Sequence, residues 1–201
     1  MDSYQGGLSL SSFMKIGCLH CGSNRVVIAH ETDKSWHKWC AKCGEEFEEI
    51  KVMEYKNGKQ FPTVGKGTKI WEPHLSNIHP EVVIGEDCVI HSHVWIGEGV
   101  KIGNNVKIQA FSFIPTGVTI EDNVFIGPRV TFTNDKYPPS QGKDWSPTHV
   151  RRGAVIGANA TILPGLEIGQ NARVGAGSVV TKSIEANVTV CGNPAKVHNK
   201  R

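Results

Sequence analysis

Residues 84–132 decide the fold, and they read IGEDCVIHSHVWIGEGVKIGNNVKIQAFSFIPTGVTIEDNVFIGPRVTF. An aliphatic or aromatic side chain recurs there at every sixth position, in a series that begins at Ile78 and ends at Phe132. The series returns after an interruption, at Val150, Ile156, Ile162, Ile168, Val174 and Val180. A period of six fits neither an α-helix nor an alternating strand. It predicts a triangular coil in which each hexapeptide supplies one short strand and one corner.

A second set of positions, four residues after each aliphatic one, carries mostly small side chains such as Cys88, Val94, Ser112 and Ala154. We expect these side chains to point inward beside the corners, which makes Cys88 an inert core thiol. The predicted fold is therefore all-β: a left-handed parallel β-helix of hexapeptide repeats over residues 69–197. Residues 133–149 lack the period and hold three prolines, so they predict a loop ejected from the coil.

Four cysteines near the start form two C-x2-C pairs, Cys18 with Cys21 and Cys40 with Cys43. Eighteen residues separate the pairs, a spacing typical of zinc sites. Four thiolates in a tetrahedron leave no open position, so the prediction is a structural Zn²⁺ in a small zinc ribbon at residues 14–50. Two unrelated cysteine pairs are the alternative. Residues 1–13 are expected to be a flexible leader and residues 51–68 a polar connection.

Composition limits the remaining possibilities. The chain has 201 residues and a formal net charge of +3, too small to favour nucleic acid as a partner. No apolar run approaches the ~20 residues of a membrane span. The start lacks the basic and apolar regions of a secretory signal, so we expect a cytoplasmic protein with reduced cysteines.

Two stretches resemble a known family. Residues 117–140 read GVTIEDNVFIGPRVTFTNDKYPPS, and residues 153–184 read GAVIGANATILPGLEIGQNARVGAGSVVTKSI, with GNPAKV following at 192–197. They resemble the hexapeptide-repeat acyltransferases and, more narrowly, the N-acetyltransferases that act on nucleotide-linked amino sugars. The resemblance covers residues 78–197 and implies acetyl-CoA as co-substrate, a nucleotide-linked amino sugar as acceptor, and a homotrimer with active sites between subunits. The zinc ribbon lies outside the family's usual pattern.

The resemblance also implies site residues. Asn134 and Asp135 match the family's polar pair at the loop entrance: Asp135 would accept a hydrogen bond from the sugar amine, and Asn134 would position the sugar or donate to the intermediate. An Asx-turn that opens the loop is the alternative. Gln109, Phe111 and Thr116 are the candidate acceptor-binding residues. Many close relatives have a glutamate where this chain has Thr116, so the acceptor can differ here.

Coenzyme A is expected along the C-terminal turns. Gly157, Ala158 and Ala176 would offer backbone donors to the pantetheine amides, and Lys182 would meet a phosphate. Lys196, Arg151 and Arg152 are alternative phosphate contacts.

Other readings of the site stay open. A catalytic base at His91 or His93 is one, and a metal site like that of the zinc carbonic anhydrases, at His74 and His79, is another. The function itself can differ: the chain can be a sugar O-acetyltransferase, or a non-enzymatic β-helix scaffold whose zinc ribbon binds a partner.

Overall fold

The computed structural model describes residues 13–14, 27–32, 35–40 and 62–198 of the chain. The first three segments are β1 (Phe13–Met14), β2 (Val27–Thr32) and β3 (Ser35–Cys40), which pair antiparallel in the order β1-β2-β3. Cys18, Cys21 and Cys43 lie outside the described residues, and so does the side chain of Cys40. The zinc ribbon therefore stays a prediction.

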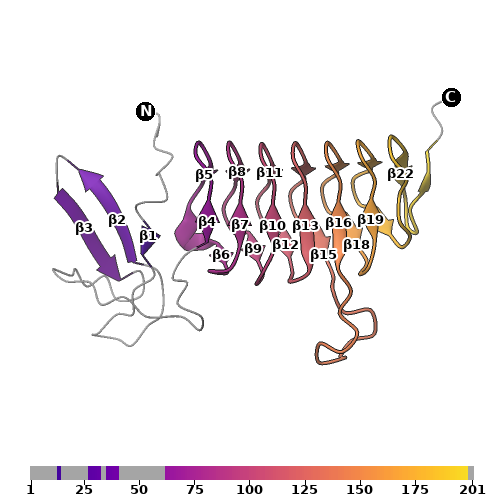
Figure 1. Ribbon diagram of the computed structural model, residues 1–201, viewed down its shortest axis with the longest axis horizontal. Helices are drawn as coiled ribbons and strands as arrows, with labels where there is room; N and C mark the ends of the chain where they lie inside the picture. The colour runs from indigo at the N-terminus through magenta and orange to yellow at the C-terminus, as the bar shows by residue number, and fades with distance from the viewer. Residues whose placement is uncertain (1–12, 15–26, 33–34, 41–61, 199–201) are drawn as a thin grey trace.

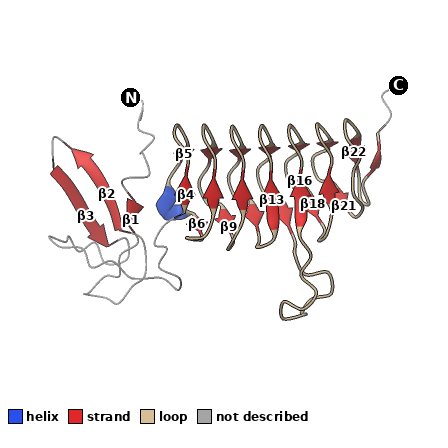
Figure 2. Ribbon diagram, viewed as in Figure 1, coloured by secondary structure: helices blue, strands red, loops and turns tan. Residues whose placement is uncertain are grey.

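From Thr63 to Cys191 the chain winds into a parallel β-helix with three faces, and a final strand at Lys196–Val197 pairs with it antiparallel (Figures 1 and 2). The first face consists of β4 (Thr63–Val64), β7 (Val83–Ile84), β10 (Lys101–Ile102), β13 (Val118–Ile120), β16 (Thr148–Val150) and β19 (Glu167–Ile168). The second consists of β5 (Lys69–Ile70), β8 (Val89–Ile90), β11 (Lys107–Ile108), β14 (Phe125–Ile126), β17 (Val155–Ile156), β20 (Arg173–Val174), β22 (Thr189–Cys191) and β23 (Lys196–Val197). The third consists of β6 (Asn77–Ile78), β9 (Trp95–Ile96), β12 (Phe113–Ile114), β15 (Thr131–Phe132), β18 (Thr161–Ile162) and β21 (Val179–Val180). The hexapeptide β-helix predicted from the period is confirmed.

Strand register follows the period of six. Lys101 pairs with Thr119, eighteen residues later, as three hexapeptides per turn require. The two ends depart from this spacing. Val64 pairs with Ile84, twenty residues later, so the first turn begins inside the expected connection at 51–68. Ile168 pairs with Ile184, only sixteen residues later, so the last turn is two residues short. A short 3₁₀ helix, η2 (Pro73–Leu75), precedes β6.

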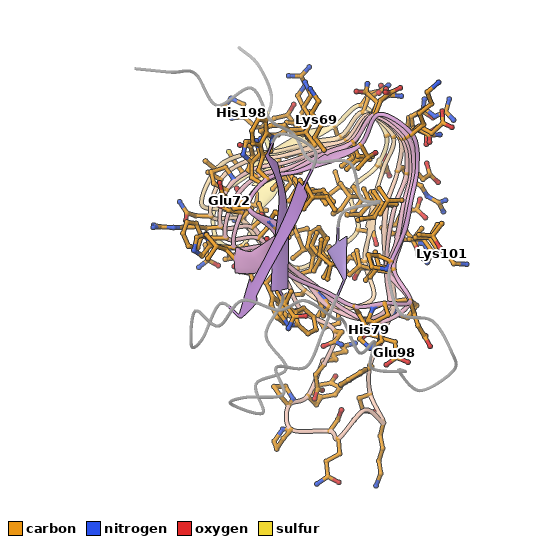
Figure 3. The ribbon with its side chains drawn as sticks, turned by 90° about the vertical axis from the view of Figure 1, so that its left-hand side faces the viewer. Lys69, Glu72, His79, Glu98, Lys101 and His198 are labelled. Atoms are coloured by element: carbon orange, nitrogen blue, oxygen red, sulfur yellow. The ribbon has the colours of Figure 1, made fainter. Side chains whose placement is uncertain are left out.

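Side chains of the aliphatic column fill the interior. Every member from Ile84 to Val180 is buried, and Ile78, at the start, is partly buried. Each fully buried isoleucine or valine contributes roughly 1.5–3 kcal/mol, so this column dominates the stability. Cys88 is buried as expected; burial raises the pKa of its thiol, and its Sγ donates to the carbonyl of Gly103 across 3.1 Å. Viewed along the solenoid, Lys101 projects outward from the ribbon (Figure 3).

Most corners of the prism use one residue with positive φ, and these residues define three edges. The asparagine edge, between the first and second faces, has Asp87, Asn105, Asn123, Gly153, Asn171 and Asn187. The stacked edge, between the second and third faces, has His93, Phe111, Arg129, Asn159 and Gly177. The loop edge, between the third and first faces, has Gly99, Gly117 and Gly165. Left-handed backbone costs a residue with a Cβ atom about 1–2 kcal/mol, least for asparagine, so His, Phe and Arg are unusual here.

A loop leaves the loop edge between β15 and β16 and projects from the solenoid (Figure 1). Thr119 of β13 pairs with His149 of β16, thirty residues later, so the loop adds twelve residues to a turn. The next strands resume in register, because Phe125 pairs with Val155 and Thr131 with Thr161. In the described part of the chain, no helix has the length and apolar character needed to cross a membrane.

Candidate functional site

The loop between β15 and β16, residues 133–147, forms an arm whose two ends are bonded to each other at its base. The backbone amide of Ser146 donates to the carbonyl of Asn134 across 2.9 Å, and Asp135 forms an antiparallel bridge with Trp145. The Thr133 hydroxyl donates to the carbonyl of Ile162 across 3.1 Å, which anchors the arm to the next turn. Tyr137 and Trp145 are exposed on the arm. The base of the arm is thus fixed to the solenoid while its aromatic side chains face solvent.

Asp135 shapes the arm. One carboxylate oxygen accepts from the amide of Tyr137 across 3.1 Å, and the other accepts from the amide of Ser140 across 2.8 Å. The Ser140 bond is the largest cause that holds the pKa of this half-buried carboxyl below its usual value. The Asx-turn alternative is therefore present in the structure. A carboxylate offers about four lone-pair positions, so this anion keeps room for one more donor.

Asn134 and Thr116 lie together on the loop edge, one turn apart. The side-chain amide of Asn134 donates to the backbone carbonyl of Thr116 across 3.4 Å. Both residues follow an inward side chain by two positions, Phe132 and Ile114 respectively, so the register itself stacks them. The structure thus brings together one predicted catalytic residue and one predicted acceptor-binding residue.

Gln109 and Phe111 lie elsewhere. They belong to the stacked edge, and β12 of the third face separates them from Thr116. Gln109 is half-buried, while Phe111 is 53% exposed. Within one chain, therefore, the predicted acceptor-binding residues occupy two different edges of the prism.

The backbone of the stacked edge carries the predicted coenzyme A residues. The amide of Gly177 donates to the carbonyl of Ala158 and the amide of Gly157 to that of Val174, each across 2.8 Å, so neither is available to a ligand. The amides of Ala158 and Ala176 differ, because no acceptor within the described residues bonds to them. A Cβ atom on Gly157 would lie 2.6 Å from the amide nitrogen of Ala176. Glycine at 157 therefore leaves space beside an unused donor.

Three of the equivalent amides on the asparagine edge, those of Glu86, Asn104 and Arg152, are capped by side chains, while those of Asp122 and Gln170 have no acceptor among the described residues. Glu86 donates to the Oδ1 atom of Asn104, and Asn104 donates to the Oδ1 atom of Asp122, each across 2.8 Å. The amide of Arg152 likewise donates to Glu121. Side chains thus cap part of the asparagine edge, whereas the amides of Ala158 and Ala176 are left for an outside acceptor.

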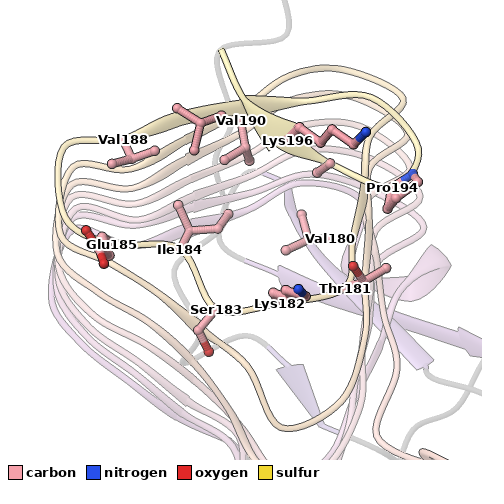
Figure 4. A pocket seen from close by; sticks show the side chains of 12 residues that line it. Val180, Thr181, Lys182, Ser183, Ile184, Glu185, Val188, Val190, Pro194 and Lys196 are labelled. Atoms are coloured by element: carbon pink, nitrogen blue, oxygen red, sulfur yellow. The ribbon is translucent and has the colours of Figure 1, made fainter. Parts of the chain in front are cut away.

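The unbonded amides of Ala158 and Ala176 form what we call the donor strip, and Lys182 lies apart from it. It belongs to the loop edge in the shortened last turn, and it lines a cavity of about 510 Å³ at the C-terminal end of the solenoid (Figure 4). Val180, Ile184 and Val190 line the same cavity from the interior, and Lys196 from the tail. Lys182 is therefore not on the edge that carries Gly157, Ala158 and Ala176.

Arg151 and Arg152, the alternative phosphate contacts, are already paired. Arg151 donates to Glu121 across 2.9 Å and also to Glu167, and Arg152 donates to Asp122 across 3.2 Å. The hydrogen bond from Arg151 is the main cause that lowers the pKa of both Glu121 and Glu167. These arginines stabilise the asparagine edge and the first face, so a phosphate would have to compete with carboxylates for them.

One cluster of stacked side chains was not predicted from the sequence. The rings of His93 and Phe111 stack with centroids 4.6 Å apart, and the Arg129 guanidinium carbon lies 5.7 Å from the Phe111 centroid. Beside them, Trp95 and Phe113 stack at 4.7 Å on the third face. The eighteen-residue spacing of His93, Phe111 and Arg129 is the signal that would have revealed the stack. Among side chains the structure describes, no group of three or more His, Cys, Asp or Glu could hold a metal ion.

Comparison with known protein families also finds the hexapeptide repeats. The family described as bacterial transferase hexapeptide (six repeats) matches residues 99–134 and 147–182, and the hexapeptide repeat of succinyl-transferase matches residues 81–114. The repeats of the solenoid are thus similar to those of the bacterial hexapeptide transferases. The first model leaves out residues 135–146, so the matched repeat is interrupted directly after Asn134, at the arm.

Relatives of the hexapeptide domain include several acetyltransferases. A serine acetyltransferase of Buchnera aphidicola subsp. Acyrthosiphon pisum is 43% identical over 108 residues, which is 54% of this chain and 37% of the relative. The galactoside O-acetyltransferase of Escherichia coli K12 is 35% identical over 124 residues, 57% of this chain and 61% of the relative. The chain thus spans less than two thirds of either relative's length.

A solved structure shares the fold of the hexapeptide domain. It is a variant of GDP-perosamine N-acetyltransferase from Caulobacter crescentus, in complex with CoA and GDP-perosamine. Its TM-score is 0.57 at 23% identity, over 66% of this chain and 57% of that one. This likeness concerns the fold.

Proposed function

We propose that the protein is an acetyl-CoA-dependent N-acetyltransferase that acts on the amino group of a nucleotide-linked amino sugar. The observation that carries the proposal is the bonding of Asp135, whose two carboxylate oxygens both accept hydrogen bonds from backbone amides. A carboxyl with a lowered pKa is a poor proton acceptor, and residues 133–149 hold histidine only at His149, on β16. A hydroxyl acceptor needs a base to activate it, whereas a neutral amine attacks a thioester with less help.

Asp135 and Asn134 would then position the reactants. Asp135 stays an anion and accepts a hydrogen bond from the sugar amine, which holds the lone pair toward the thioester carbon. Asn134 donates to the oxyanion that develops on the thioester oxygen. As the tetrahedral intermediate collapses, the carbon–sulfur bond breaks and the thiolate leaves with the proton that the nitrogen gives up. Thr116, beside Asn134, would contact the acceptor.

Coenzyme A would lie along the stacked edge. The unbonded amides of Ala158 and Ala176 offer donors to the pantetheine carbonyls, and the small side chains there leave the backbone accessible. The C-terminal position of Lys182 is compatible only with the phosphate end of the cofactor, and only if that end crosses from the stacked edge to the loop edge.

A single chain does not bring these two groups together, because Asn134 lies on the loop edge and Ala158 on the stacked edge. We therefore include a homotrimer in the proposal, in which the arm of one copy meets the stacked edge of the next. Exposed Tyr137 and Trp145 on the arm, and exposed Trp95, Phe111 and Phe113 on and beside the stacked edge, supply apolar surface for that contact. Size-exclusion chromatography with light scattering should give three times the chain mass.

Sugar O-acetylation is the second candidate, favoured by the galactoside O-acetyltransferase and serine acetyltransferase among the relatives. Incubating the protein with acetyl-CoA and a panel of acceptors, with thiol release as readout, separates the candidates. Nucleotide-linked amino sugars should release thiol and give a base-stable amide. A base-labile ester from a galactoside would favour the alternative. No thiol release and no calorimetric binding of coenzyme A would leave only the scaffold.

A further inference from the structure

We propose that Arg129, stacked on Phe111, forms an anion clamp for the diphosphate of the acceptor. This inference rests on the proposed function and adds a substrate group to it. No ion pair involves Arg129 within the described part of the chain. Its guanidinium carbon lies 5.7 Å from the centroid of the Phe111 ring. A guanidinium held over a ring keeps its N–H fork free for two oxygens of one anion.

The backbone at Arg129 and Phe111 is in an unfavourable conformation. Arg129 has φ 58° and Phe111 has φ 64°, both in the left-handed region where glycine or asparagine is usual. The asparagine edge uses Asn, Asp or Gly at this position, and the loop edge uses Gly. Further along the stacked edge, Asn159 and Gly177 occupy it as well. Strain accepted in consecutive turns on one edge points to a role for the side chains that cause it.

Backbone hydrogen bonds fix the spacing of the stack. The amide of Phe111 donates to the carbonyl of Ser92 across 3.3 Å, and the amide of Arg129 donates to the carbonyl of Ala110 across 3.0 Å. The ring of His93 covers the other face of Phe111, with centroids 4.6 Å apart. The aromatic side chains therefore act as a rigid support that limits where the guanidinium can go.

The position of Arg129 along the edge favours the acceptor over coenzyme A. The unbonded amides of Ala158 and Ala176 lie in the next two turns toward the C-terminus. A cofactor that follows those amides reaches Arg129 only with its reactive end, which carries no phosphate. The acceptor must approach that end from the other side, where Gln109 and Phe111 lie. Its diphosphate is then the anion that Arg129 meets.

Calorimetric titrations of the full chain test this assignment, with UDP, GDP, dTDP and coenzyme A as separate probes. Wild type should bind at least one of the nucleoside diphosphates, and Arg129→Gln should weaken that binding about tenfold or more. Phe111→Leu should weaken it less, because the guanidinium stays but loses its support. Coenzyme A affinity should be unchanged in both variants. Arg173→Gln is the matched control, because Arg173 is an exposed arginine on β20 that has no assigned role.

Several results would overturn the clamp. One is a wild type that binds none of the three nucleoside diphosphates, and another is an Arg129→Gln variant that binds them as wild type does. A loss of coenzyme A affinity instead would assign the arginine to the cofactor. A change of oligomeric state in Arg129→Gln, seen by light scattering, would make the stack a subunit contact.

Kinetics separate this proposal from the one on which it rests. Arg129→Gln should raise KM for a nucleotide-linked amino sugar while leaving KM for the same sugar without its nucleotide unchanged. Equal losses for both acceptors would contradict the clamp. If no acceptor releases thiol, yet nucleoside diphosphate binding still depends on Arg129, the N-acetyltransferase assignment fails and the clamp stands.

Discussion

The side-chain amide of Asn134 donates to the backbone carbonyl of Thr116 across 3.4 Å, which is long for an N–H···O hydrogen bond. A bond of this length is weak, so the amide can turn toward a substrate at little cost. We expect Asn134→Ala to lower kcat by about 100-fold if the amide donates to the oxyanion. The affinity for free coenzyme A should stay the same, because coenzyme A without its acetyl group has no thioester oxygen for this amide to meet.

Asn123→Ala is the control for this prediction. Asn123 is an exposed asparagine of the asparagine edge, where its Oδ1 atom accepts a hydrogen bond from Asn105 across 2.8 Å. This variant should lose stability and keep its kcat. If steady-state kinetics give Asn134→Ala the kcat of wild type, Asn134 has no place in the chemistry.

Gly157→Ala tests the donor strip. Its Cβ atom would lie 2.6 Å from the amide nitrogen of Ala176 and block that donor. Gly103→Ala is a matched control, since its Cβ atom would lie 2.7 Å from the amide nitrogen of Asp122 on the asparagine edge. Both variants should lower the melting temperature. Only Gly157→Ala should weaken coenzyme A binding, by about tenfold for one lost hydrogen bond. Equal calorimetric affinities in the two variants would argue against the strip.

Thr148 presents a buried hydroxyl without a partner. It is 1% exposed, its Oγ1 atom has no hydrogen bond among the described residues, and it pairs with Val118 one turn earlier. Valine has nearly the same shape, so Thr148→Val should stabilise the protein by about 1 kcal/mol in urea unfolding. Thr68→Val should do the opposite, because Thr68 donates to Gly85 across 2.7 Å and accepts from Cys88 across 2.9 Å. A loss of stability in Thr148→Val would mean that its hydroxyl has a partner, such as a bound water.

Acid stability should depend on Arg151. Its hydrogen bonds hold the pKa of Glu121 and Glu167 below their ordinary values. A carboxyl with a lowered native pKa contributes stability above its unfolded pKa, about 4.3 for glutamate, and loses it as pH falls through the native pKa. Melting temperatures of wild type should therefore fall more steeply below about pH 5 than those of Arg151→Met. Arg152→Met should follow wild type, and parallel curves for wild type and Arg151→Met would exclude this linkage.

The sequence predicted the solenoid because its period is set by backbone geometry alone. An inward residue every six positions, from Ile84 to Val180, needed no knowledge of partners, and even the polar Ser112 fell inside as expected. The ends were harder. Val64 packs against the core and Ile184 belongs to it, yet they lie twenty and sixteen residues from their pairing partners, so a count by six misses them.

The candidate site was predictable only where register decides it. Thr116 and Asn134 are eighteen residues apart, so their contact follows from the repeat. Phe111 is nearer to Thr116 in sequence, but a strand places it on another edge. The Asp135 hydrogen bonds to Tyr137 and Ser140 depend on the conformation of an aperiodic segment, which the repeat does not specify.

The arm enters and leaves the prism at one corner, and the strands on either side of it keep their pairing, as Thr131 with Thr161 shows. Its length and contents are therefore independent of the architecture that carries it. Such an insertion can be exchanged for another of different length and sequence while the core side chains on either side of it stay in place. In the proposed enzyme, acceptor preference can therefore change with the arm while the core stays the same.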